Sequence, residues 1–125
     1  METADKRPHV VVLEDDQDVA ELVREILDDS GFDTMTADHN TPAEVVAGHR
    51  PRLLLMDLLL GDRDGHDVLA ALRRAGLAQV PLVLMSGRQE LDREMRALGA
   101  VATLAKPFDI EELIGTCRGL VAAEA

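Results

Sequence analysis

The chain has 125 residues, enough for one domain, and its 24 acidic against 13 basic residues give a formal net charge of −11 at pH 7. Phosphate backbones repel such a charge, and a chain with no Trp or Tyr and two Phe offers no platform for stacked bases, so we expect no direct nucleic-acid binding. No apolar stretch reaches membrane-spanning length and the one cysteine cannot form an internal disulfide, which predicts a cytoplasmic protein with no membrane contact.

The first strand and helix are predicted close to the amino terminus. Residues 10–13 form a continuous apolar run, as expected of a strand buried on both faces. Apolar residues then repeat at i, i+3, i+4, i+7 and i+8 over residues 19–27, which is the stripe of a helix. Ser30 and Gly31 supply the signal that ends this helix.

A second strand and helix follow. Residues 33–37 are more polar than the first strand, which is typical of a strand at the edge of a sheet. Thr41 and Glu44 have the spacing of a capping box, and Pro42 suits the first helical position. We therefore expect a second helix that begins at Pro42 with Thr41 as its cap.

The middle of the chain contains the most apolar run, over residues 53–56, which predicts a third strand. A helix is expected from about residue 64 to residue 75, where Gly76 would end it. Residues 82–85 predict a fourth strand. Strand and helix signals therefore continue to alternate through this region.

The carboxyl-terminal part predicts a short helix over residues 91–98, which ends at Gly99, and a last strand over residues 101–105. Asp109 is expected to cap a final helix. Cys117 lies on the apolar stripe of that helix, so we interpret it as a core residue and not as a nucleophile. This fivefold alternation favours an α/β fold, a doubly wound parallel sheet with helices on both faces.

Polar residues follow four of the predicted strands. Glu14 and Asp15 follow the first, Asp57 the third, Ser86 the fourth and Lys106 the fifth. The carboxyl ends of parallel strands lie on one edge of the sheet, where open α/β folds bind their ligands. We therefore expect these carboxylates, the hydroxyl and the ammonium group to meet in one crevice.

Such a cluster suits phosphoryl transfer. Neighbouring carboxylates repel one another unless a cation neutralises them, and Mg²⁺ prefers carboxylate, water and phosphate oxygens. A carboxylate can also act as a nucleophile and form an aspartyl phosphate. In that chemistry Lys106 and the metal ion would neutralise charge, and Ser86 would bond a phosphoryl oxygen.

Five short motifs carry a resemblance to a known family. They are Val-Leu-Glu-Asp-Asp after the first strand, Leu-Leu-Met-Asp-Leu around Asp57, Asp64-Gly65, Leu-Met-Ser-Gly, and Lys106-Pro107-Phe108. In this order and spacing, the chain resembles the receiver domains of two-component response regulators, and stand-alone chemotaxis regulators in particular. The resemblance extends from about residue 10 to residue 121. It implies a flavodoxin-like (βα)5 sheet in the order 2-1-3-4-5.

The resemblance also implies roles for individual residues. Asp57 would be the phosphoacceptor, with Ser86 and Lys106 contacting the phosphoryl group, and a cis peptide bond would precede Pro107. The metal ligands would be Asp15 directly, Glu14 mainly through a water molecule, and two further groups, Asp57 and the backbone carbonyl of Leu59. Asp16 would cap the first helix instead of binding metal.

As a receiver, the chain would be a phosphoacceptor switch that takes its phosphoryl group from a histidine kinase or phosphotransfer protein. It would catalyse only its own phosphorylation and dephosphorylation. We expect residues 1–125 to form a single receiver domain with a core over about residues 8–122, no output domain, and a monomeric or weakly dimeric state.

Departures from the family pattern keep alternatives open. Thr103 stands where receivers usually have an aromatic residue, so an aromatic switch is not expected, and a degenerate receiver that serves as an interaction module remains an alternative. An aspartyl-phosphate phosphatase needs a second aspartate at position 59, where this chain has Leu59. A flavin carrier would need a first loop that accepts phosphate, which the acidic residues after the first strand oppose. The four histidines show no ligand-like spacing, and we interpret them as surface or loop residues.

Overall fold

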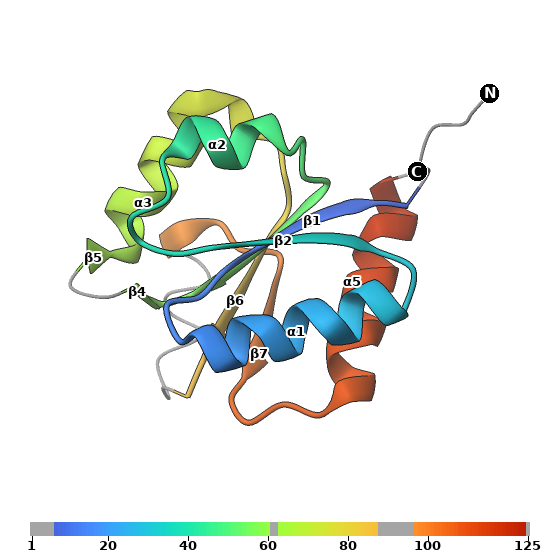
Figure 1. Cartoon of the computed structure of the whole chain (residues 1–125). Coiled ribbons are helices and arrows are strands. Elements are labelled where there is room, and N and C mark those ends of the chain that lie inside the picture. The colour runs from blue at the N-terminus through green and yellow to red at the C-terminus, as the bar shows by residue number, and fades with distance from the viewer. Residues whose placement is uncertain (1–6, 61–62, 88–96, 125) are drawn as a thin grey trace.

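Five strands form one parallel sheet in residues 7–60, 63–87 and 97–124, the parts of the chain that the computed structural model describes (Figure 1). The strands are β1 (His9–Leu13), β2 (Asp33–Ala37), β3 (Leu53–Asp57), β6 (Leu82–Ser86) and β7 (Ala102–Ala105). Their order in the sheet is β2-β1-β3-β6-β7, and every neighbouring pair is parallel. Counted within this sheet the order is 2-1-3-4-5, so the predicted flavodoxin-like α/β fold is confirmed.

Helices cover both faces of the sheet (Figure 1). One face carries α1 (Gln17–Asp29) and α5 (Ile110–Glu124), and the other carries α2 (Ala43–Gly48), α3 (Gly65–Leu72) and the π-helical turn η1 (Arg73–Leu77). A small antiparallel pair, β4 (Leu59–Leu60) with β5 (Arg63–Asp64), connects β3 to α3. The predicted helix over residues 91–98 falls mostly outside the described residues. Among the residues that are described, no helix has both the length and the apolar character needed to cross a membrane.

Alternate residues of the central strands supply two separate cores. Val11 and Leu13 of β1 pack in the cluster that includes Val46 of α2, whereas Val10 and Val12 pack in the cluster that includes Val23 of α1. Successive side chains of a strand point to opposite faces, so a strand covered on both sides must be apolar throughout. This explains the continuous apolar runs in the sequence. Because each inner strand contributes to both cores, both helical layers pack on the same sheet.

The ends of α1 form as the sequence predicts. Asp16 is the N-cap, and its Oδ1 accepts hydrogen bonds from the amides of Asp18 at 3.0 Å and Val19 at 3.2 Å. Ser30 is the C-cap, and Gly31 follows with φ of 99°, a conformation that glycine adopts without a steric penalty. The Asp16 carboxylate is therefore bonded to the start of α1, although Asp16 directly follows the strand-end residues Glu14 and Asp15.

The predicted start of the second helix is wrong. The N-cap of α2 is Pro42 and no side chain caps this helix, so Thr41 and Glu44 do not form a capping box. The Thr41 hydroxyl instead accepts a hydrogen bond from the Asp38 amide at 3.0 Å, because these two residues close a turn after β2. A local hydrogen bond to the backbone thus competes with capping.

The later elements differ little from the predictions. The helix expected over residues 64–75 is divided between α3 and η1, and Gly76 has φ of 108° as a helix-ending glycine should. Asp109 precedes α5 and accepts a hydrogen bond from the Glu112 amide at 2.7 Å, which confirms the predicted cap. Cys117 is fully buried, and burial raises the pKa of its thiol to about 12, as suits a core residue.

Candidate functional site

The carboxyl ends of the strands gather the polar residues that the sequence analysis selected. Glu14 follows β1, Asp57 and Ser86 end β3 and β6, and Lys106 follows β7. Glu14, Asp57 and Ser86 are 4%, 9% and 2% exposed, so these polar groups are buried within the described part of the molecule. Buried polar groups need partners, and this edge of the sheet provides them.

Lys106 joins the two buried carboxylates. Its Nζ donates hydrogen bonds to Glu14 Oε1 at 2.5 Å and to Asp57 Oδ2 at 2.9 Å, and both contacts are also ion pairs. The sheet order is β1-β3-β6-β7 on this side, so the lysine side chain reaches across β6 to Asp57 and across β6 and β3 to Glu14. The predicted meeting of Glu14, Asp57 and Lys106 in one crevice is therefore what the structure has.

Backbone hydrogen bonds continue the sheet past the strand ends and hold these residues in place. The amide of Glu14 donates to Ala37 O at 2.9 Å, and the amide of Lys106 donates to Ser86 O at 2.8 Å. The peptide bond between Lys106 and Pro107 is cis, as the resemblance implied. The side chains of the site consequently start from fixed positions on the sheet.

The charges of the site shift two pKa values. Burial, together with the neighbouring Asp57 carboxylate, raises the pKa of Glu14, and the bond from Lys106 opposes this shift without cancelling it. Burial acts to lower the pKa of Lys106, but the bonds to Glu14 and Asp57 outweigh it and raise that pKa. The site thus favours the charged form of Lys106 and disfavours the charged form of Glu14.

Asp15 has a partner that the sequence analysis missed. Its Oδ1 accepts a hydrogen bond from the His39 amide at 2.9 Å, and its Oδ2 lies 2.8 Å from His39 Nδ1. His39 comes two residues after β2, so it lies at the same edge of the sheet as the other strand-end residues. Extending the strand-end argument to β2 would have found it.

Three further predicted positions take defined places in the backbone. Leu59 starts β4 and pairs with Asp64, and one residue separates it from the end of β3. Ser86 is the last residue of β6, opposite Ala105 of β7. Thr103 is half-buried in β7, opposite Leu84, where receivers usually place an aromatic ring.

The donor atoms of this edge fit Mg²⁺. They are carboxylate and carbonyl oxygens, the ligands that this ion prefers. Burial first, and then the neighbouring Asp57 carboxylate, raise the pKa of Glu14 even though Lys106 bonds to both groups. A divalent cation would relieve the repulsion between the two carboxylates, so the residues present match the chemistry of the ion.

The interpretation of the histidines needs correction. His9 begins β1, and His9, His49 and Asp33 offer ligand atoms that all lie within 4.8 Å of one another. His39 contacts Asp15, as described above. Spacing along the chain did not reveal either arrangement, because the sheet brings together residues that are far apart in sequence.

Comparisons with known proteins match this chain to response regulators. The sequence model of the response regulator receiver domain matches residues 10–118. The transcriptional regulatory protein CpxR of Klebsiella pneumoniae is 32% identical over 114 residues, which cover 90% of this chain and 48% of that protein. Sporulation initiation phosphotransferase F of Bacillus subtilis is 29% identical over 107 residues, which cover 83% of this chain and 86% of that protein.

The structural comparison gives the same picture. The receiver domain of the Francisella response regulator 1452 superimposes with a TM-score of 0.82 and 25% identity, covering 95% of this chain and all of that one. The chain spans about half the length of CpxR, so the match concerns the part of that protein that this chain resembles.

Proposed function

Because the chain belongs to the response regulator receiver domain family, we propose that it accepts a phosphoryl group on Asp57, with Mg²⁺ as the cofactor. Receiver domains are the phosphoacceptor switches of two-component systems. The observation that carries the assignment to Asp57 is its place at the end of β3, buried, 2.9 Å from Lys106 Nζ. Asp15 is more exposed and faces His39, which makes it a weaker candidate for the acceptor.

In the proposed reaction an Asp57 carboxylate oxygen attacks phosphorus, the new P–O bond forms, and the P–N bond to the donor histidine breaks. The ring nitrogen of the donor keeps the electron pair of the P–N bond and takes a proton from water, so the donor leaves as neutral imidazole. Lys106, already bonded to the carboxylate, follows the negative charge onto the phosphoryl oxygens, and the Ser86 hydroxyl donates to one of them. A Mg²⁺ ion would offset the charge between the two anionic reactants. Its proposed ligands are Glu14 through water, Asp15, Asp57 and the Leu59 carbonyl.

We further propose that the donor is a histidine kinase or a phosphotransfer protein, and that it docks beside Lys106. An apolar groove there is lined by Val19, Leu22, Lys106, Pro107 and Phe108. Leu22 is 56% exposed on α1, next to the site in the part of the chain that the structure describes. Exposed apolar surface that adjoins a reactive group is where a protein donor would bind.

The test is labelling with a small phosphodonor. Wild-type protein incubated with acetyl phosphate and Mg²⁺ should gain one phosphoryl group by mass spectrometry, and EDTA should prevent the gain. Asp57→Asn should abolish labelling, whereas Asp67→Asn, a change at an exposed residue of α3, should leave it unchanged. Equal labelling of wild type and Asp57→Asn would refute the assignment.

The same experiment separates the alternatives. A degenerate receiver, which Thr103 keeps open, would take up no phosphoryl group with or without Mg²⁺. A phosphatase would turn over a phosphomonoester such as p-nitrophenyl phosphate, which the proposed acceptor should not do. The cytoplasmic location, the monomeric or weakly dimeric state and the single-domain organisation stay predictions.

A further inference from the structure

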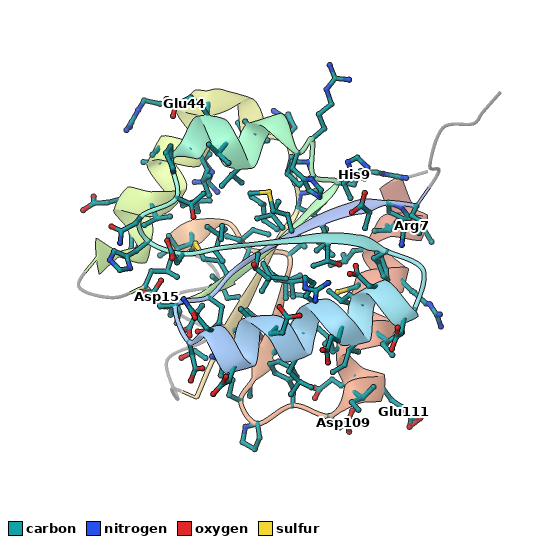
Figure 2. The ribbon with its side chains drawn as sticks, viewed as in Figure 1. Arg7, His9, Asp15, Glu44, Asp109 and Glu111 are labelled. Atoms are coloured by element: carbon teal, nitrogen blue, oxygen red, sulfur yellow. The ribbon has the colours of Figure 1, made fainter. Side chains whose placement is uncertain are left out.

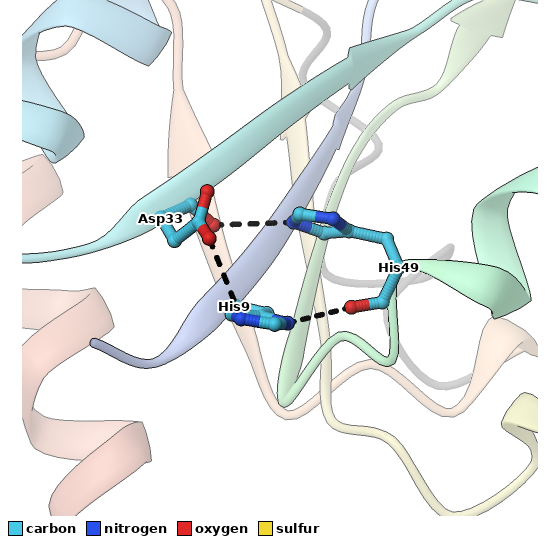
Figure 3. Close-up of side chains that lie close together, drawn as sticks. All are labelled: His9, Asp33 and His49. Carbon is cyan, nitrogen blue, oxygen red and sulfur yellow. Dashed lines mark hydrogen bonds and ion pairs between the residues drawn. The ribbon is translucent and has the colours of Figure 1, made fainter. Parts of the chain in front are cut away.

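A second cluster of possible metal ligands lies at the opposite edge of the sheet from Asp57. His9 is the first residue of β1 and Asp33 the first of β2, and the two are direct partners in the parallel register. His49 follows the end of α2 and reaches the same place (Figure 3). Figure 2 labels His9 and Asp15 at opposite ends of β1, so this cluster is separate from the proposed phosphorylation site.

The three residues hold one another in a specific arrangement. The two imidazole rings are stacked, with centroids 4.7 Å apart and planes inclined by 22°. His9 Nδ1 lies 2.7 Å from the His49 carbonyl oxygen, and His9 Nε2 lies 3.4 Å from Asp33 Oδ2. His49 Nε2 lies 3.3 Å from the Asp33 carbonyl oxygen, and Figure 3 shows both rings facing Asp33.

The short contact of His9 determines its tautomer. A carbonyl oxygen only accepts hydrogen bonds, so His9 Nδ1 carries the hydrogen that it donates to His49. In the neutral ring, Nε2 then presents its lone pair to the Asp33 carboxylate. Two electron-pair donors that face each other repel unless a cation lies between them. A metal ion between these two atoms would remove that repulsion.

We propose that His9, His49 and Asp33 bind a late first-row divalent metal ion such as Zn²⁺. Two imidazole nitrogens and one carboxylate oxygen are ligands that Zn²⁺ binds, and a water molecule can complete a tetrahedral site with three protein ligands. The bond from His9 Nδ1 to a backbone carbonyl is the outer contact that commonly orients a metal-binding histidine. Mg²⁺ prefers oxygen ligands and should not compete here.

The spacing of the ligand atoms permits such a site. Ligands about 2.1 Å from a tetrahedral ion lie roughly 3.4 Å from one another. The ligand atoms here lie within 4.8 Å of one another, and His9 Nε2 and Asp33 Oδ2 already lie 3.4 Å apart. All three residues are partly exposed, so water and ions can enter. His49 Nε2 now faces the Asp33 carbonyl and its ring stacks on His9, so the His49 ring must rotate out of both contacts to direct an unprotonated nitrogen at the ion. Binding would join the starts of β1 and β2 to the end of α2.

The experiment is calorimetric titration of tag-free protein with Zn²⁺ at pH 7.5 in excess Mg²⁺, which occupies the carboxylate site. One Zn²⁺ per chain should bind. His9→Gln and His49→Gln should each weaken binding roughly tenfold or more, whereas His66→Gln should leave it unchanged. Far-UV circular dichroism checks that every variant is folded, and Asp33→Asn provides a third variant that keeps the size of the side chain.

Imidazole NMR gives an independent measurement. Zn²⁺ should shift the ring resonances of His9 and His49 but not those of His66. If the ring resonances of His9 and His49 do not respond to Zn²⁺, the proposal is overturned. Equal Zn²⁺ affinity in wild type, His9→Gln and His49→Gln also overturns it. Neither result depends on phosphorylation of Asp57.

Discussion

At the scale of single residues, the ionisation of Glu14 affects the stability of the fold. Its carboxylate is buried near that of Asp57, and the Lys106 ammonium group donates hydrogen bonds to both. Because burial raises the pKa of Glu14 above its ordinary value of 4.5, the folded state binds more protons than the unfolded state in mild acid. The stability that this provides is complete below pH 4.5 and is lost as pH rises through the raised pKa.

We therefore predict that wild type loses stability relative to Glu14→Gln as pH rises from 4.5 towards neutrality. Urea denaturation in EDTA at several pH values measures this difference. Lys106 also has a raised pKa, but its contribution is lost only above its ordinary value of 10.5 and leaves this window unaffected. Parallel stability profiles for the two proteins would contradict the prediction.

His39 is expected to compete with the metal ion for Asp15. Both oxygens of Asp15 accept from His39, one from its amide and one from its ring. His39→Ala keeps the amide and removes the ring, and one hydrogen bond is worth about 0.5–1.5 kcal/mol. We predict that Mg²⁺ then binds about two- to tenfold more tightly, measured by calorimetry. His66→Ala is the control, and weaker Mg²⁺ binding by His39→Ala would show that the ring orients Asp15 for the ion.

At the scale of elements, the N-terminus of α1 depends on one side chain. Asp16 accepts hydrogen bonds from the amides of Asp18 and Val19, which have no carbonyl partner within the helix. Asp16→Ala should destabilise the protein by about 1 kcal/mol in chemical denaturation. Asp29→Ala, at the other end of the same helix, should have no effect or a small stabilising one, because an acidic residue is unfavourable there. Equal losses from both changes would show that the cap is not the cause.

Elements whose signal is local were predictable from the sequence. The inner strands of the sheet are apolar because both faces are covered. Glycines with positive φ, Gly31 after α1 and Gly76 within η1, mark where the helices end. The start of α2 was mispredicted because Thr41 bonds to Asp38 instead of capping the helix. The β4–β5 pair was not predicted, since strands of two residues have no periodicity.

The site was predictable to the extent that sheet topology determines it. Parallel strands align their ends, so Glu14, Asp57 and Lys106 could be expected to meet. Extending this argument to β2 would also have placed His39 near Asp15. The pairing of His9 with His49 could not be derived in this way, because His49 follows α2 and its contact with His9 depends on how that loop folds over the sheet. Such contacts leave no regular pattern in the sequence.

At the scale of the whole molecule, Mg²⁺ is expected to stabilise the fold. The ion binds the folded state, whose carboxylates are held together, more tightly than the unfolded chain. At ten times its dissociation constant the gain is about 1.4 kcal/mol by mass action. Calorimetry should show a melting temperature several degrees higher in Mg²⁺ than in EDTA at neutral pH. Asp57→Asn should have a higher melting temperature than wild type in EDTA, and Mg²⁺ should raise its melting temperature by less. Identical melting temperatures of wild type with and without the ion would argue against the site.

The three charges that meet at the site are separated widely along the chain. Lys106 lies 92 residues after Glu14 and 49 residues after Asp57. A ribosome that adds about 5–20 residues per second needs roughly 2–10 s to proceed from Asp57 to Lys106. During that interval the two carboxylates exist without the ammonium group, and β7 is missing from the sheet edge. If the proposed function is right, a nascent chain should therefore be unable to accept a phosphoryl group until Lys106 has been added and β7 has joined the sheet.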